Sequence, residues 1–268
     1  MGPQPQQAIA ASEADGAAAF PMLAVPAPWQ SFPERFEWAA ENGFALTYAP
    51  NPDAPHLIPQ HVGPFVRSGV PVRYHGFFPG CEIGDQNALS AERAVSIHKH
   101  AMEAICGHGE PVITFHIGLD PGIPIDPDRA MENLGRLVEY GKRLGITVCI
   151  ENLRRGVSSH PEVIRRWAET TGSGITFDIG HASGSERVLR GELSLDEFAD
   201  SFGAHLMEVH FYEKETDRHY PPRDMVLLGP LADRLLGTSC RWWTIELLDG
   251  TEALDTRALV LNYLSKGV

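Results

Sequence analysis

The segment VITFHIGLDPGIPIDPDRAMENLGRLVEYGKRLGITVCIENL, from Val112 to Leu153, decides the fold class because it contains one complete strand–helix–strand unit. It opens with an apolar, β-branched run that is typical of a buried strand. Apolar residues then recur at helical spacing over Asp126–Leu144, where Pro127 fits the first helical turn and Gly145 fits a helix end. A second β-favouring run begins at Thr147. The segment therefore predicts two strands connected by a helix.

The same alternation repeats along the chain from about Phe20 onward, and it occurs eight times. The predicted strands are Phe20–Pro26, Phe44–Ala49, Val70–Gly76, Val112–Ile117, Thr147–Leu153, Ile175–Ile179, Leu206–Phe211 and Trp243–Leu248. The predicted helices are Pro33–Glu41, His56–Arg67, Ala91–Ile105, Asp126–Leu144, Pro161–Thr170, Leu195–Phe202, Pro230–Leu236 and Glu252–Leu264.

This count favours one architecture over its main alternative. Eight strand–helix units in about 250 residues match a closed parallel barrel. An open doubly wound sheet would normally carry a G-x-G-x-x-G turn after its first strand, and this chain has none there. We therefore expect a single (β/α)8 TIM barrel over residues 20–268, preceded by a disordered N-terminal extension over residues 1–19.

Composition narrows the class of protein. The 268 residues include 22 Lys and Arg against 35 Asp and Glu, a formal net charge of −13, which disfavours nucleic acid as a partner without excluding a local basic cleft. No apolar window is long enough for a membrane span. The first 19 residues contain Glu13 and Asp15 and lack a basic start, so we expect a cytoplasmic protein. The 4 cysteines fall singly and are predicted to be buried thiols.

Histidines and acids gather where the predicted strands end. In a parallel barrel the loops that follow the strands meet on one face, which is where such barrels place their chemistry. The residues at or just after strand ends are His75, His116, Glu151, Asp178, His181, His210, Asp217, His219 and Glu246. Other histidines, such as His98, His100 and His160, lie in predicted helices or their caps and are expected on solvated faces.

Convergence of these groups implies a cation. Three carboxylates brought together would repel one another and lose solvation, and a divalent metal ion removes that penalty. Carboxylate and imidazole ligands without a thiolate suit Mn, Co, Zn or Mg. We expect one ion, although the number of candidate ligands is compatible with up to three.

The ordered strand ends resemble those of the xylose-isomerase-like barrel superfamily, which includes sugar isomerases, ketose 3-epimerases, inosose dehydratases and endonuclease IV. The strings that carry the resemblance are Tyr74-His75-Gly76, Phe115-His116, Ile150-Glu151-Asn152, Phe177-Asp178-Ile179-Gly180-His181, Val209-His210 and Ile245-Glu246. By resemblance to the epimerases, one metal would be held by Glu151, Asp178, His210 and Glu246, and His181 would contact substrate.

Resemblance to endonuclease IV implies a different site. There, additional zinc ligands would correspond to His75, His116, His181, Asp217 and His219. This chain departs from that pattern, because Leu153-Arg154-Arg155-Gly156 follows the fifth strand and Tyr220-Pro221-Pro222 follows His219, where the endonuclease has glycine-rich sequences.

The resemblance implies a metal-dependent isomerase or epimerase acting on a sugar, sugar phosphate or polyol. Glu151 and Glu246 would move a proton next to a carbonyl, through an enediolate whose charge the metal stabilises. Rim residues expected to bind substrate are Arg154, Arg155 and Arg218, which could bind an anionic group, and the aromatic residues Trp29, Tyr48, Phe77 and Phe78. The alternatives are a multinuclear zinc phosphodiesterase and a non-catalytic metal-binding barrel. Barrels of this size commonly pair, so a homo-oligomer is compatible with the sequence.

Overall fold

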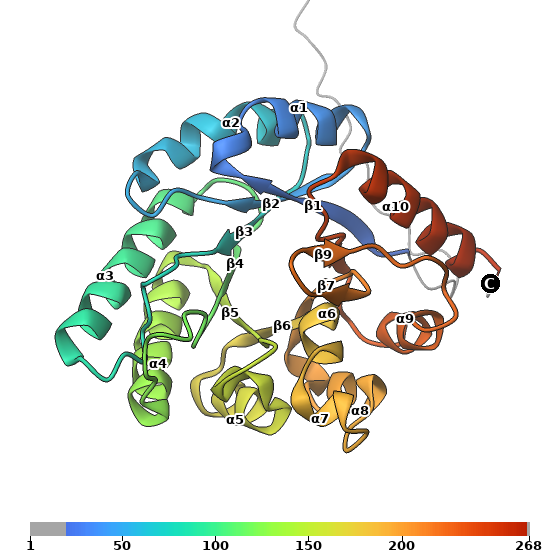
Figure 1. The fold of residues 1–268 in the computed structure, drawn as a ribbon. Helices are drawn as coiled ribbons and strands as arrows, with labels where there is room; N and C mark the ends of the chain where they lie inside the picture. Colours follow the sequence, from blue (N-terminus) through green and yellow to red (C-terminus); the bar gives the residue numbers. More distant parts are fainter. Residues whose placement is uncertain (1–19, 267–268) are drawn as a thin grey trace, which may run out of the picture.

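The computed structural model describes residues 20–266, so the predicted extension over residues 1–19 lies outside the described part. Eight parallel strands close into a barrel in the order β1-β10-β7-β6-β5-β4-β3-β2. Their bounds are β1 Met22–Pro28, β2 Ala45–Ala49, β3 Val72–Gly76, β4 Val112–Phe115, β5 Thr147–Glu151, β6 Gly174–Asp178, β7 Leu206–His210 and β10 Trp242–Thr244. The expected (β/α)8 fold class is confirmed (Figure 1).

Helices surround the barrel on its outer side (Figure 1). They are α1 Glu34–Glu41, α2 Ile58–Arg67, α3 Ala88–Ile105, α4 Pro127–Leu144, α5 Pro161–Thr171, α6 Ile179–Ser183, α7 Glu186–Leu189, α8 Leu195–Asp200, α9 Gly229–Leu236 and α10 Gly250–Leu264. Short 3-10 turns occupy Trp29–Ser31, Pro55–Leu57, Val157–Ser159 and Gly203–His205. Among the described residues, no helix combines the length and apolar character needed to cross a membrane.

Alternate residues of each barrel strand face two environments, the apolar layer under the helices and the interior of the barrel. Val72 and Tyr74 of β3 are fully buried among the apolar residues that pack under the helices. Arg73 and His75, which alternate with them, point into the barrel, since Arg73 Nη1 donates to the carbonyl of Met207 on β7 at 2.9 Å. The interior below the rim is polar, and hydroxyl pairs at 2.7 Å cross it: Thr47 with Thr244, and Thr114 with Thr176. The apolar core therefore lies outside the barrel strands, which leaves the interior for polar groups.

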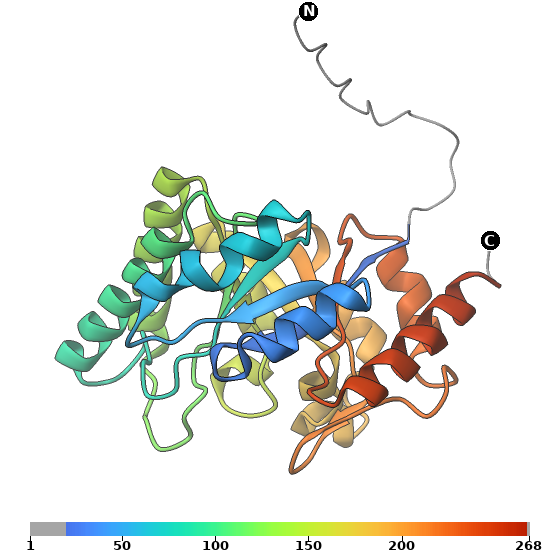
Figure 2. The same ribbon diagram turned by 90° about the horizontal axis from the view of Figure 1, so that it is seen from above.

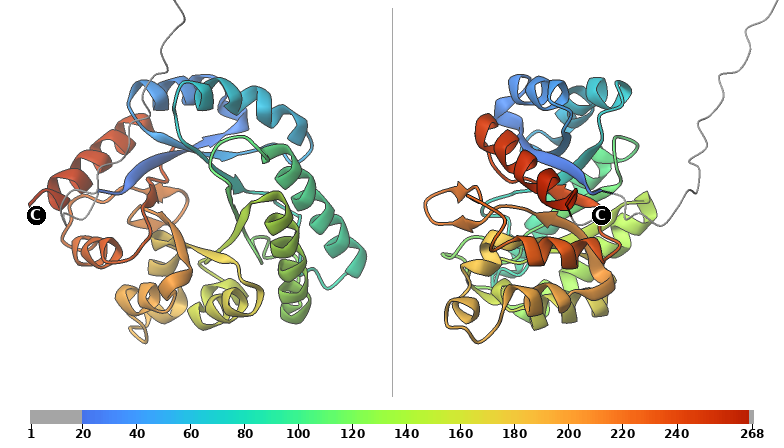
Figure 3. Two further views of the ribbon diagram at one scale, coloured as in Figure 1. Left: turned by 180° about the vertical axis from the view of Figure 1, so that it is seen from behind. Right: turned by 90° about the vertical axis from the view of Figure 1, so that its right-hand side faces the viewer.

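One feature of the rim is absent from the predicted elements. Strands β8 Lys214–Glu215 and β9 His219–Tyr220 form an antiparallel hairpin in the connection after β7. The hairpin, coloured orange, projects beyond the helices in Figures 2 and 3. Glu215 pairs with His219 in its register, which places both side chains on the same side of the hairpin.

The cysteines only partly match the expectation of buried thiols. Cys149 and Cys240 are buried, Cys81 is half-buried and Cys106 is exposed. Cys106 caps the end of α3, where the chain leaves the core, so its exposure follows from its place at a helix end.

Candidate metal centre

Four side chains from four strands meet at the carboxyl end of the barrel. Glu151 ends β5, Asp178 ends β6, His210 ends β7 and Glu246 lies two residues beyond β10. His210 Nδ1 is at the middle of the group. Its distances are 3.4 Å to Glu151 Oε2, 3.6 Å to Asp178 Oδ2 and 3.3 Å to Glu246 Oε2. All four of these atoms are buried and lack a hydrogen-bond partner.

These distances fit a shared cation better than a hydrogen-bonded cluster. Charge-assisted hydrogen bonds have lengths of about 2.7–2.9 Å, shorter than any of the three. Ligand atoms placed about 2.1 Å from a tetrahedral ion are about 3.4 Å from one another. These four polar atoms, which lack hydrogen-bond partners, have the spacing and the oxygen and nitrogen chemistry that a divalent metal ion could use, and no sulfur is among them.

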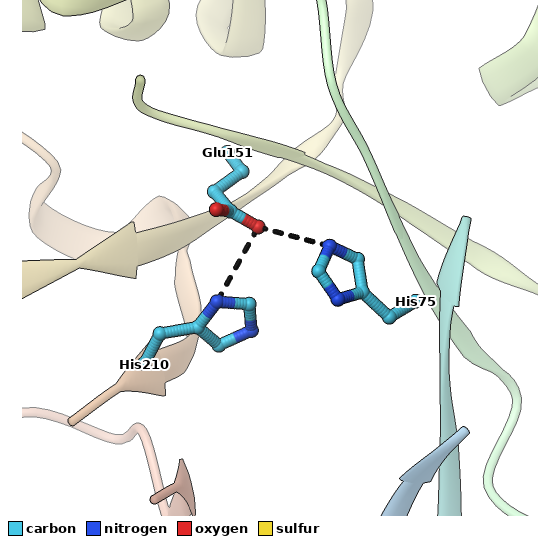
Figure 4. A group of neighbouring side chains, drawn as sticks. All are labelled: His75, Glu151 and His210. Atoms are coloured by element: carbon cyan, nitrogen blue, oxygen red, sulfur yellow. Dashed lines mark ion pairs between the residues drawn. The ribbon is translucent and has the colours of Figure 1, made fainter. Parts of the chain in front are cut away.

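A second triangle of ligand atoms shares Glu151. The Nε2 atoms of His75 and His116 lie 3.3 and 3.4 Å from Glu151 Oε2, and 3.2 Å from each other. Figure 4 shows the Glu151 oxygen between the imidazoles of His75 and His210. One carboxylate oxygen therefore lies within 3.4 Å of three imidazoles, those of His75, His116 and His210.

A third group joins the β8–β9 hairpin to the rim. His181, Glu215 and His219 place ligand atoms within 4.8 Å of one another. The Nδ1 atoms of the two histidines lie 3.0 Å from the Asn152 carbonyl and 2.9 Å from the Glu246 carbonyl. Each ring thus keeps its Nε2 free, and His181 Nε2 is 3.4 Å from Glu215 Oε2.

Two residues expected to bind metal or substrate, Asp217 and Arg218, have other partners. Asp217 occupies the hairpin turn, where it accepts hydrogen bonds from Thr216 and Tyr220 and faces solvent. Glu215 reaches the histidines in its place, because it is cross-strand from His219 and Asp217 is not. Arg218 forms a two-pronged ion pair with Glu252 of α10, at 2.6 and 2.8 Å, so its guanidinium ties the hairpin to that helix.

The protonation of the cluster follows from its charges. Burial opposes ionisation of Glu151, but the imidazoles of His210 and His116 outweigh burial and hold its pKa well below the usual value. Burial also opposes protonation of His210, but the carboxylates of Glu246 and Glu151 raise its pKa well above the usual value. Protons therefore occupy this histidine when no cation is bound. A divalent cation that bound at His210 Nδ1 would have to displace the proton there, so its affinity would increase with pH.

Local sequence positions Asp178 and His181. Asp178 caps α6, with Oδ1 accepting the His181 backbone N–H at 2.6 Å. The Asn152 side chain forms two 2.9 Å bonds with the Asp178 backbone, one to its carbonyl and one from its N–H. Gly180 is required between them, because a Cβ there would lie 1.9 Å from the ring of Tyr212. That ring stacks on His219 at 4.1 Å, which links α6 to the hairpin.

Beneath the centre lies a buried acid that strand ends did not reveal. Glu208 is fully buried, and its Oε1 lies 3.4 Å from His210 Nε2, on the opposite side of the ring from the cluster. The same oxygen accepts the Thr244 hydroxyl at 2.8 Å, and the Arg73 guanidinium is 4.0 Å from Oε2. Glu208 precedes His210 by two residues, so period-two alternation on a strand is the signal that places both inside the barrel.

A small cavity opens above Glu246, and its walls only partly match the expected residues. It has a volume of about 190 Å³, and Phe77 borders it while Trp29, Tyr48 and Phe78 are not among its walls. Tyr48 points outward and its hydroxyl contacts His61 Nδ1 at 2.8 Å, because its neighbours Thr47 and Ala49 take the inward positions of β2. Trp29 and Phe78 pack against the apolar core.

The remaining basic residues and histidines have other partners. Arg154 Nη1 donates to the Glu215 carbonyl at 2.9 Å, which holds the hairpin beside the centre. Arg155 lines a separate surface hollow together with Arg187 and Arg190. His98 contradicts its expected place on a solvated face: it is 2% exposed, and its ring lies 4.3 Å from Phe115. His98 sits on the side of α3 that faces the barrel, where burial lowers its pKa to about 4.

Comparison with known proteins supplies the family. A sequence model of xylose isomerase-like TIM barrels matches residues 36–258. The uncharacterized protein MJ0008 of Methanocaldococcus jannaschii is 34% identical over 177 residues, which are 66% of this chain and 76% of the relative.

Several solved structures have the same fold as this chain. One is a D-tagatose 3-epimerase-like protein, with a TM-score of 0.74 and 18% identity over 91% of this chain and 97% of that chain. Another is the TTHB071 protein of Thermus thermophilus soaked with ZnCl2, with a TM-score of 0.71 and 18% identity over 92% and 99%. A third is endonuclease IV of Thermus thermophilus, with a TM-score of 0.67 and 17% identity over 92% and 100%. At these identities the likeness shows the fold alone.

Proposed function

The chain belongs to the xylose isomerase-like TIM barrel family, and from this premise we propose that it is a divalent-metal-dependent isomerase or epimerase of a small sugar-like substrate. The reaction is proton transfer at the carbon next to a carbonyl. One observation carries the proposal: Glu151 and Glu246 come from strands separated in the barrel by β6 and β7, yet both reach His210 Nδ1 within 3.4 Å.

The ligand set assigns a role to each residue. Glu151, Asp178, His210 and Glu246 would hold the ion. A bound divalent cation acts as a Lewis acid that stabilises negative charge on the substrate carbonyl oxygen.

The two glutamates would also carry the proton. One carboxylate removes it from the carbon next to the carbonyl, and the other delivers a proton to the product. The Nδ1 of His181 is engaged by the Asn152 carbonyl and its Nε2 is 3.4 Å from Glu215 Oε2, so Nε2 would be the atom that hydrogen-bonds a substrate oxygen.

Solvent exchange tests the proposal. Metal-free protein is reloaded separately with Mn²⁺, Co²⁺, Zn²⁺ or Mg²⁺ and incubated in D₂O with a panel of ketoses, aldoses, their phosphates, and α-hydroxy ketones that carry an alkyl or aryl group. We expect deuterium at the carbon next to the carbonyl of at least one compound, with wild type and not with Glu246→Gln. The matched control is Glu169→Gln, which lies on the outer surface of α5 with its side chain 57% exposed and should exchange like wild type. Failure of every loaded form to exchange any compound would refute the proposed function.

A second candidate is metal-assisted hydrolysis of a phosphate ester. The His75–His116–Glu151 triangle and the His181–Glu215–His219 group favour it, because they would offer ligand atoms to more than one ion. Ions about 3.5–4 Å apart could activate water and stabilise the leaving oxygen. Two or three zinc ions per chain, together with cleavage of bis(p-nitrophenyl) phosphate or an abasic duplex, would support this candidate over the isomerase.

A further inference from the structure

The residues that line the cavity above Glu246 form two chemically different groups. The polar group consists of His75, His219 and Glu246. The other group, the apolar wall, lies at the ends of β1 and β2 and in the loops after β3 and β10. The apolar residues there are Pro26, Pro28, Ala49, Phe77 and Leu248.

The hydrogen-bonding groups of the apolar wall are largely occupied within the protein. Pro26 and Pro28 have no N–H. The Pro26 carbonyl accepts from Arg35 Nε at 3.2 Å, and the Pro28 carbonyl accepts from the Ser31 hydroxyl at 2.8 Å. The hydroxyl of Thr47, the polar side chain at the foot of this wall, is 2.7 Å from Thr244 and 3.2 Å from Trp242 Nε1.

Two of the apolar side chains are conspicuously open to solvent. Phe77 is 46% exposed and Leu248 is 68% exposed, and both border the cavity. Large apolar side chains that border a concave site are typical of surfaces that bind an apolar part of a ligand. A polyhydroxylated chain placed against them would lose hydrogen bonds to water and gain few in return.

We propose that this wall binds an apolar group, alkyl or aromatic, carried by the same substrate molecule whose oxygens face the metal ligands. The substrate class is then a hydroxycarbonyl compound with an apolar substituent, in place of a free polyol. This inference rests on the proposed function, because the metal-facing end of the substrate sets the position of the apolar end.

Three hydroxamates test the inference, since each carries the same metal-chelating group. Acetohydroxamate has a methyl group, benzohydroxamate has a phenyl ring and gluconohydroxamate has a polyol chain. Their dissociation constants for the zinc-loaded full chain are measured by isothermal titration calorimetry. We expect benzohydroxamate to bind about tenfold more tightly than acetohydroxamate, because the ring buries apolar area, and gluconohydroxamate to bind no more tightly than acetohydroxamate.

Variants assign the difference to the wall. Leu248→Ser and Phe77→Ser should each reduce the preference for benzohydroxamate at least threefold. Leu89→Ser is the matched control, because Leu89 is 83% exposed on α3 and does not border the cavity, so the preference should persist. Circular dichroism checks that each variant is folded.

The outcomes separate the two proposals. Equal binding of benzohydroxamate and acetohydroxamate, or tighter binding of gluconohydroxamate, overturns the apolar wall and leaves the metal centre standing. A preference that survives both wall substitutions also overturns it. Failure of all three compounds to bind zinc-loaded protein overturns the metal centre and, with it, the inference.

Discussion

Replacing Glu208 by Gln should weaken metal binding although Glu208 is not a ligand. Its carboxylate faces His210 Nε2 at 3.4 Å, while Nδ1 of the same ring faces the three carboxylates of the centre. A carboxylate on the far nitrogen fixes the ring orientation and makes the ligand nitrogen more basic. Gln keeps the size and can still accept the Thr244 hydroxyl, so the change removes charge with little loss of packing.

The distance between Glu208 Oε1 and His210 Nε2 sets the expected loss of metal affinity. Loss of a partner of this kind costs about 10–100-fold in metal affinity. The 3.4 Å separation is longer than a charge-assisted hydrogen bond, so we expect the lower end, about tenfold or 1.4 kcal/mol.

Competition with a chromophoric chelator measures the zinc dissociation constant directly, and the visible spectrum of the Co²⁺ form reports the ligand field. Glu169→Gln is the control, because Glu169 has the same chemistry on the outer surface of α5 with its side chain 57% exposed. An affinity for Glu208→Gln within twofold of wild type, with an unchanged Co²⁺ spectrum, would refute the positioning role.

Three further changes test the centre, its support and the core. Glu246→Gln should abolish turnover and lower zinc affinity without unfolding the barrel, as chelator competition and circular dichroism would show; full activity would contradict its assigned role. Gly180→Ala should cost about 3 kcal/mol or more in urea unfolding, because its Cβ would lie 1.9 Å from the Tyr212 ring, and an unchanged midpoint would contradict the packing. The pKa of His98 is lowered to about 4 in the folded protein. Neutral His98 therefore contributes about 3 kcal/mol to the free energy of unfolding above pH 6.5, and this contribution is lost as pH falls toward 4. In His98→Asn the free energy of unfolding should fall less steeply between pH 6.5 and 4. A decrease as steep as that of wild type would refute the role of His98 in this pH dependence.

The barrel was predictable because every strand–helix unit repeats one pattern. The run Val112–Ile117 and the helix Asp126–Leu144 correspond to β4 and α4 with ends shifted by two residues or fewer. The β8–β9 hairpin was missed because each of its strands has two residues, too few to show a period of two. Missing the hairpin also affected the predicted site, because the hairpin register brings Glu215 to His219 and leaves Asp217 at the turn.

Ligand candidates were predictable where a strand ends in a reactive side chain. Glu151, Asp178 and His210 are the last residues of β5, β6 and β7, and parallel strands deliver their ends to one rim. The partners of the rim arginines were not predictable, because charge alone does not say whether a guanidinium meets a substrate or a helix. Arg218 binds Glu252, 34 residues later in the chain, and only the fold brings the two together.

The alternation of side chains along a strand explains the two remaining differences between the predicted and the observed site, at Tyr48 and Glu208. A side chain two residues before an inward ligand also points inward, and a side chain one residue away from an inward position points outward. His210 faces the centre, so Glu208 must lie in the layer below it; Ala49 borders the cavity, so Tyr48 must pack under the helices. Strand ends therefore identify which groups can reach an ion, and parity identifies which groups support them. The same rule turns Pro26 and Pro28 toward the cavity together, since they share one face of β1, and both contribute to its apolar wall.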